Sequence, residues 1–74
     1  MKINKFIKLD PAQVKDFVLA ATRCDFDVDI SYNRIVVDAK SILGVLGLNF
    51  SYPLKVSYNG FNQYFEDYLT NHSY

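Results

Sequence analysis

The stretch FDVDISY, residues 26 to 32, constrains the fold of this chain more than any other feature. Large apolar side chains alternate there with Asp and Ser, at Phe26, Val28, Ile30 and Tyr32. This period of two is typical of a strand with one buried face and one wet face. Asn33 tolerates the left-handed conformation of a tight turn, and RIVVD then supplies β-branched residues for a partner strand. The sequence therefore predicts a hairpin over residues 26–38.

Two elements are expected before this hairpin. Residues 2–9 alternate imperfectly around Phe6 and Ile7, which indicates a first strand. From Pro11 to residue 23 the apolar side chains recur at helical spacing. Asp10 is the expected N-cap of this helix, Pro11 fits its first position, and Gln13 completes a capping-box pattern.

Three further elements are expected after the hairpin. Residues 39–48 indicate a short helix, with Asp38 or Ser41 as its cap and Gly47 near its end. Residues 52–58 alternate again, and Pro53 there suits the first residue of a strand or an edge strand. A last amphipathic helix follows the Asn59-Gly60 turn. Its apolar stripe is expected in the core and consists of Phe61, Tyr64, Phe65, Tyr68 and Leu69.

The order of elements is therefore β-α-β-β-α-β-α, over one domain that spans residues 1–74. Half of the 74 residues are hydrophobic, and six Phe and six Tyr are among them, so a folded globular domain is expected. Helices on one face of a mostly antiparallel sheet would bury all of these stripes. The fold class predicted is a two-layer α+β domain.

Charge and composition exclude several classes of partner. The formal net charge is zero and no Lys/Arg cluster occurs, so nucleic acid is not an expected partner. No apolar run approaches the ~20 residues that cross a membrane, and MKINKFIKL lacks the apolar core of a signal peptide. The single Cys24 cannot form an internal disulfide, which favours a reducing cytosol. A cytoplasmic protein is expected.

Metal and cofactor sites have little support in the sequence. One His and one Cys lie far apart, and no ligand pair has zinc spacing. Asp25, Asp27 and Asp29 superficially resemble calcium ligands, but a solvated strand face explains their alternation with buried residues. We expect no metal and no cofactor.

The stretch VDAKSILGVLGL, residues 37–48, carries more aliphatic side chains than one buried stripe can use. A two-turn helix would turn Val45 and Leu48 to the core and leave aliphatic side chains exposed around Ser41. The exposed set is expected among Ile42, Leu43 and Leu46. Exposed aliphatic clusters on a small protein mark partner sites.

The order of elements, together with FDVDISYN and above all AKSILGVLGL, resembles HPr, the histidine-containing phosphocarrier family of the bacterial sugar phosphotransferase system. Residues 40–46 follow the family's Lys-Ser-Ile-Met-Gly-Val-Met pattern, with leucines in place of the methionines. The resemblance implies an open-faced β-sandwich, in which three helices cover one face of four antiparallel strands. It implies a carrier or regulatory protein and no enzyme.

The family's carrier site is altered in this chain. Counted back from Ser41, Asp10 occupies the position of the phosphorylated His, Ala12 that of the Arg and Gln13 that of the Pro. The only histidine, His72, lies near the C-terminus, where we expect it to be exposed and inert. Asp10 is expected to act as a helix cap, although aspartyl phosphates exist as covalent intermediates.

Ser41 occupies the position at which Gram-positive members are phosphorylated by an ATP-dependent kinase, and the phosphorylated form binds a transcriptional regulator. Phosphorylation would add about −1.5 to −2 charges beside the aliphatic side chains. A serine at a helix start is also a common N-cap, which needs no kinase. Both interpretations remain open.

Three functions follow from the sequence. The first is a degenerate HPr-like regulatory or adaptor protein, whose partners by resemblance are HPr kinase, phosphotransferase components or a transcriptional regulator. The second is an interaction or self-association module that uses the aliphatic surface without phosphorylation, as a monomer or weak homodimer. The third is a phosphocarrier that uses Asp10.

Overall fold

The hairpin forms where the alternation predicts it. In the computed structural model, which describes residues 2–74, strand β2 (Val28–Tyr32) pairs antiparallel with strand β3 (Ile35–Asp38). Asn33 in the turn has a φ of 57°, the left-handed conformation that Asn tolerates. The strand begins two residues later than expected, and Phe26 lies before it with its ring stacked on Tyr58.

Two more strands complete one antiparallel sheet in the order β1-β4-β2-β3. Strand β1 (Ile3–Ile7) and strand β2 pair with opposite sides of strand β4 (Leu54–Tyr58), so β4 is central. Pro53 immediately precedes this strand. The alternative that Pro53 marks an edge strand is therefore wrong, and a proline just outside the ladder removes no hydrogen bond from it.

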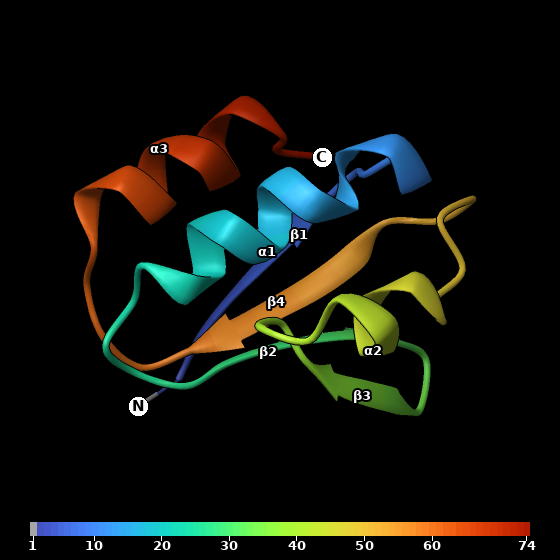
Figure 1. Ribbon diagram of the computed structural model, residues 1–74, viewed down its shortest axis with the longest axis horizontal. Coiled ribbons are helices and arrows are strands. Elements are labelled where there is room, and N and C mark those ends of the chain that lie inside the picture. Colours follow the sequence, from blue (N-terminus) through green and yellow to red (C-terminus); the bar gives the residue numbers. More distant parts are fainter. Residues whose placement is uncertain (1) are drawn as a thin grey trace.

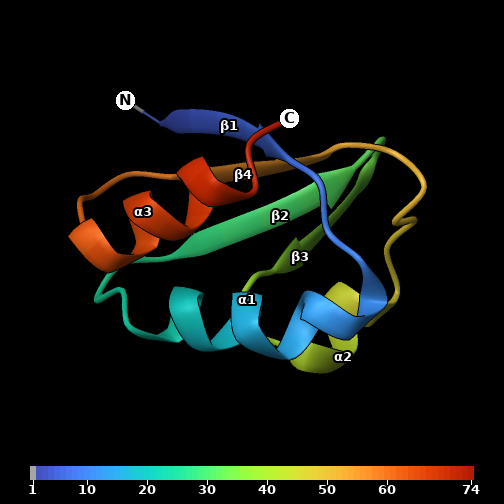
Figure 2. The same cartoon turned by 90° about the horizontal axis from the view of Figure 1, so that it is seen from above.

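The helices lie together on one face of the sheet (Figures 1 and 2). A 3-10 turn, η1 (Pro11–Gln13), leads into α1 (Val14–Thr22), α2 spans Ile42–Leu46, and α3 spans Gln63–Asn71. The short helix begins later than the predicted residue 39, because Ala39 and Lys40 form the turn out of β3. The α+β fold with four antiparallel strands and three helices on one face is confirmed.

The core lies between the helices and the inner face of the sheet. Strand residues of one parity point into it, such as Ile30 and Val56, which are fully buried. In β1 the inward side chain is Ile7, whereas its neighbour Phe6 is exposed on the other face. From the helices the fully buried large side chains are Val14, Phe17, Val45, Phe65 and Leu69.

The stripe predicted for the last helix is only partly buried. Phe65 and Leu69 are in the core and Tyr68 is half-buried, but Phe61 and Tyr64 are exposed. The helix begins at Gln63, so Phe61 lies outside it, and the Tyr64 ring instead contacts the Arg23 guanidinium at 4.2 Å. The expectation that all five side chains form core is wrong for these two.

The C-terminal residues lie along the outer edge of β1 (Figure 2). The Lys8 N–H donates to the His72 carbonyl at 3.0 Å, and the Tyr74 N–H donates to the Phe6 carbonyl at 3.2 Å. Ile7 and Ser73 form an antiparallel bridge between these two bonds. The C-terminal end of this edge strand is thus covered by the chain's own last residues. Across residues 2–74, each helix is too short or too polar to cross a bilayer.

Candidate functional site

Helix α2 carries the sequence pattern that most suggests a function, and Ser41 is the N-cap of this helix. The Gly44 N–H donates to the Ser41 hydroxyl oxygen at 3.2 Å, and Ser41 has the extended backbone of an N-cap residue. The sequence offered Asp38 or Ser41 as the N-cap, and the structure shows that it is Ser41. The Asp38 carboxylate instead accepts from the Lys40 N–H at 2.9 Å, in the turn before the helix.

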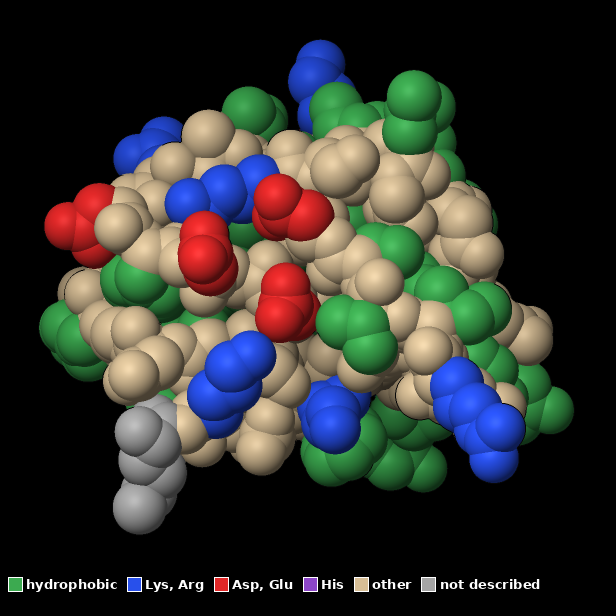
Figure 3. Space-filling view, turned by 90° about the horizontal axis from the view of Figure 1, so that it is seen from below, with side chains coloured by type: hydrophobic (Ala, Val, Ile, Leu, Met, Phe, Trp, Pro, Cys, Tyr) green, Lys and Arg blue, Asp and Glu red, His purple; other side chains and the backbone are tan. Residues whose placement is uncertain are grey.

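The aliphatic side chains of this helix divide between core and solvent as the sequence predicts. Val45 is fully buried and Leu48, just after the helix, is nearly so. The other three remain exposed and form what we call the aliphatic patch: Ile42 at 46%, Leu43 at 84% and Leu46 at 46% exposure. In Figure 3 hydrophobic side chains gather on the right of the view, the side on which α2 and β3 lie in Figure 1. Their role as a docking surface stays a prediction.

A glycine brings α2 close to β3. A Cβ atom added at Gly44 would lie 3.3 Å from the Val37 Cβ and 3.3 Å from the Ser41 hydroxyl oxygen. This spacing is tighter than an ordinary contact, so the glycine lets the helix approach the strand closely. Gly47 ends the helix as predicted, with a negative φ of −79° that any residue adopts.

The start of the first helix is built as a cap. The Asp10 N–H donates to the Gln13 side-chain oxygen at 2.9 Å, and the Gln13 N–H donates to the Asp10 backbone carbonyl at 2.9 Å. Asp10 and Gln13 thereby form the capping box that the sequence predicts. Asp10 and Ala12 are both exposed. Within residues 2–74 no cationic side chain forms an ion pair with Asp10.

His72 is not the free tail residue expected from its position. Its ring stacks on the Tyr68 ring with centroids 4.2 Å apart, and its Nδ1 lies 2.9 Å from the Tyr68 carbonyl oxygen. The side chain is half-buried. The expectation of an exposed histidine is wrong, because the backbone pairing of residues 72–74 with β1 holds this end of the chain against the protein.

A polar network that sequence reasoning missed joins β1, β4 and α3. The Glu66 carboxylate accepts a hydrogen bond from the Lys5 ammonium at 2.5 Å and another from the Tyr58 hydroxyl at 2.6 Å. Burial would raise the pKa of Glu66, but these two hydrogen bonds outweigh it and lower the pKa overall. Burial, together with the bond to Glu66, raises the pKa of Tyr58 far above its usual value. The network fixes α3 on the sheet, and a lysine at an inward strand position was its only sequence signal.

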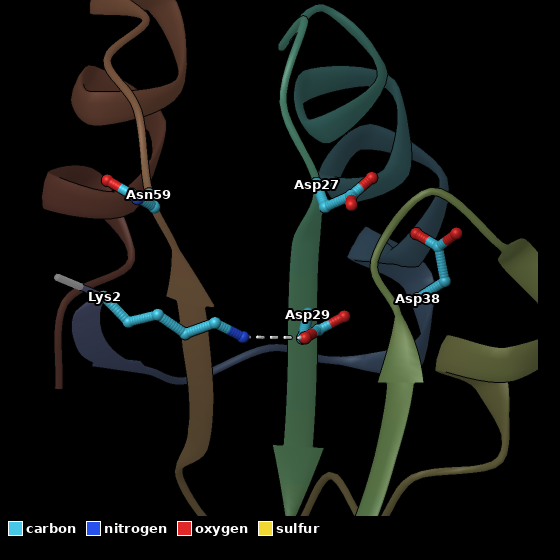
Figure 4. A pocket seen from close by; sticks show the side chains of 5 residues that line it. All are labelled: Lys2, Asp27, Asp29, Asp38 and Asn59. Carbon is cyan, nitrogen blue, oxygen red and sulfur yellow. Dashed lines mark hydrogen bonds and ion pairs between the residues drawn. The ribbon is translucent and has the colours of Figure 1, made fainter.

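Acidic side chains gather at one end of β2 and β3 around a hollow of about 480 Å³ (Figure 4). Asp27 and Asp29 line it, together with Asp38 at the end of β3 and Asn59 just after β4. The Lys2 ammonium lies 3.4 Å from the Asp29 carboxylate, an exposed ion pair worth little in stability. Among residues 2–74 no group of His, Cys, Asp and Glu has an arrangement that could hold a metal ion.

The lone cysteine has no sign of reactivity. Cys24 lies just after the end of α1 and is buried, and this burial raises the pKa of its thiol. A raised pKa keeps the thiol protonated and unreactive near neutral pH.

Comparisons with known proteins point to one fold. Neither a protein-family model nor a curated protein sequence matches the chain. A solved structure, the phosphocarrier protein HPr from Bacillus anthracis str. Ames, superimposes with a TM-score of 0.67. The comparison covers 100% of this chain and 96% of that one, at 22% sequence identity. At this identity the similarity shows that the chain has the fold of HPr.

Proposed function

We propose that this chain is a regulatory or adaptor protein on the HPr fold, which binds a protein partner through the aliphatic patch and Ser41. The observation that carries the proposal is the exposure of three large aliphatic side chains on a helix of five residues. A small protein with a limited core gains stability by burying such side chains. Leaving all three exposed beside a serine therefore favours a partner that covers them.

Ser41 would make this surface switchable. Its hydroxyl is accessible, because the residue is exposed and accepts only one weak cap bond, 3.2 Å from the Gly44 nitrogen. A phosphate there would place about −1.5 to −2 charges at the border of the aliphatic patch. Such a change rejects a partner that needs an apolar surface and recruits one that offers an arginine.

The altered carrier position supports a role without phosphohistidine transfer. Counted back from Ser41, Asp10 falls at the position of the family's phosphorylated histidine, and it forms no ion pair with a cation within residues 2–74. An acyl phosphate at Asp10 would need such charge compensation. The protein would be a non-enzymatic component of a bacterial phosphotransferase system, and its single unpaired Cys24 fits the reducing cytosol expected for it.

The first test is intact mass spectrometry after incubation with ATP and an HPr kinase. We expect one added phosphate, which fragmentation locates on Ser41 and which Ser41→Ala abolishes. Phosphorylation of an ordinary HPr under the same conditions is the control for the kinase. An unmodified protein beside a modified control would contradict phosphorylation at Ser41.

The second test measures binding of this kinase in its catalytically inactive form. Leu43→Ala removes the most exposed side chain of the aliphatic patch and should raise the dissociation constant about 10-fold, as expected for losing burial of most of a leucine. Leu19→Ala is the matched control, because Leu19 is also an exposed leucine, 54% accessible, but lies on α1. Equal effects of both substitutions would contradict docking through α2.

The phosphocarrier alternative has its own assay. Incubation with enzyme I and phosphoenolpyruvate would add a phosphate to Asp10 if this residue replaced the histidine. We expect no mass gain, and a gain that Asp10→Asn abolishes would overturn this part of the proposal.

A further inference from the structure

The two edges of the sheet differ in how they are protected. Residues 72–74 cover the outer edge of β1 at its C-terminal end, from Phe6 onward. The outer edge of β3 pairs with no strand within residues 2–74. An open edge presents unpaired backbone groups and is a template for another strand. Two of its side chains, Ile35 and Val36, are also exposed apolar residues.

The hydrogen bond at the end of β3 shows which backbone groups point outward. The Ala39 N–H donates to the Val28 carbonyl at 2.9 Å, across from β2. Backbone groups alternate between the two sides of a strand, so Val36 and Asp38 direct theirs to the open edge. The Asp38 carbonyl already accepts from the Ser41 N–H at 3.0 Å. The Val36 N–H and carbonyl and the Asp38 N–H are therefore available.

The charges along this edge match those of a second, antiparallel copy of the same strand. The sequence Arg34-Ile-Val-Val-Asp38 has a cation at one end and an anion at the other. In an antiparallel pair centred on Val36, Arg34 of each copy lies opposite Asp38 of the other. Cross-strand pairs of opposite charge stabilise a sheet, and like charges opposite one another destabilise it.

The chain itself leaves these charges uncompensated. Within residues 2–74 neither Arg34 nor Asp38 forms an ion pair. Asp38 moreover lies directly opposite Asp29 in the register of β2 and β3, an unfavourable pairing of like charges. Figure 4 shows both carboxylates in the acidic hollow, and Lys2 is the single cation among the lining residues that the structure describes. A second copy would bring Arg34 to this place.

We propose that two copies of this chain associate through the open edge of β3, antiparallel and with a two-fold axis at Val36. The two four-stranded sheets then form one continuous sheet. The axis is perpendicular to the sheet, so both helical layers lie on the same side. The interface is a few residues long and falls below the size of stable complexes, so a dissociation constant on the order of 100 µM is expected.

A charge exchange tests the register. Sedimentation equilibrium between about 10 µM and 1 mM should show a monomer-dimer equilibrium for the wild type. Arg34→Asp alone and Asp38→Arg alone each place like charges opposite one another, and each should weaken association at least about 10-fold. A mixture of the two variants restores both opposite-charge pairs and should dimerise again. Lys15→Asp, an exposed charge reversal on α1, is the control and should leave association unchanged.

A cysteine at the axis gives an independent measurement. The two Val36 residues would face each other as a hydrogen-bonded pair with Cα atoms ~5.5 Å apart, within the range of a disulfide. Val36→Cys should give a covalent dimer under mild oxidation, whereas Lys55→Cys, exposed on the interior strand β4, should not. The native Cys24 is buried and remains as an internal control.

Three results would overturn the proposal. A wild-type protein that remains monomeric at 1 mM would contradict the proposed dimer. If Arg34→Asp and Asp38→Arg leave the dimer unchanged, association takes place through another surface. The same conclusion follows if the two variants stay monomeric when mixed. Self-association through the aliphatic patch would instead be abolished by Leu43→Ala. Because Ser41 phosphorylation is measured by mass, failure of the dimer and failure of the proposed function are distinguishable.

Discussion

Gly60 lies beneath an aromatic ring, and the substitution Gly60→Ala should be among the most damaging single-methyl additions in the protein. A Cβ atom at this position would lie 2.4, 2.6 and 2.7 Å from three carbons of the Phe26 ring. The backbone at Gly60 has no positive φ, so an alanine meets no conformational strain of its own. The expected cost is purely steric and comes from Phe26.

The magnitude follows from how far the ring must move. Carbon atoms pack at ~3.5 to 4.0 Å, so the Phe26 ring must shift by about 1 Å. The ring cannot swing away freely, because it stacks on the buried Tyr58 with centroids 5.9 Å apart. Overpacking of this kind costs about 1 to 3 kcal/mol, from which reduced freedom of the unfolded chain recovers ~0.4 to 1 kcal/mol. We expect a net loss of about 1 to 2 kcal/mol.

Urea unfolding followed by circular dichroism measures this loss. For a domain of this size the expected change lowers the melting temperature by roughly 4 to 16 °C. Gly47→Ala is the matched control, because a Cβ there would lie 3.4 Å from the Gly44 carbonyl oxygen, an ordinary contact. That substitution should be neutral or stabilising by up to ~1 kcal/mol.

A double-mutant cycle identifies the clash. Phe26→Leu removes the ring, so Gly60→Ala should cost at least ~1 kcal/mol less in that background than in the wild type. Equal costs in both backgrounds, or equal stabilities of Gly60→Ala and Gly47→Ala, would refute the steric explanation.

Two further predictions concern buried polar groups. Because the pKa of Glu66 is lowered in the folded state, its contribution to stability is present above its unfolded pKa of ~4.3 and is lost as the pH falls through the folded value. Unfolding measured at pH 7 and pH 3 should therefore show a larger loss for the wild type than for Glu66→Gln, which should also be less stable at pH 7 by about 1 to 2 kcal/mol; parallel losses would contradict the role of this carboxylate. The Tyr68 hydroxyl is buried with no hydrogen-bond partner among residues 2–74, and burial raises the pKa of Tyr68 to about 12. Tyr68→Phe should accordingly be neutral or stabilising by up to ~1 kcal/mol in urea unfolding, and a loss above 1 kcal/mol would indicate a partner for the hydroxyl.

Local features of the sequence were sufficient for the elements and for the surface of α2. Alternation over residues 26–32, followed by Asn33, determined the β2–β3 hairpin, because both signals act over a few neighbouring residues. The excess of aliphatic residues in α2 likewise predicted exposure, since a helix of five residues presents only one side to the core. These predictions depended on the local sequence alone.

Tertiary structure decided everything that depends on residues far apart in the chain. The periodicity of α3 could not show that Phe61 and Tyr64 lie outside the core, because the extent of coverage depends on where neighbouring elements end. The docking of His72 beside β1 joins residues more than sixty positions apart, and no local pattern encodes such a contact.

The site divides in the same way. The sequence by itself determined that Ser41 stands among aliphatic residues and that Asp10 begins a helix. Only the fold placed Val37 against Gly44, brought Lys5 to Glu66 and left β3 at an open edge of the sheet. The physical reason is that helix caps and apolar stripes are local, whereas strand order and charge pairing arise only when the chain closes on itself.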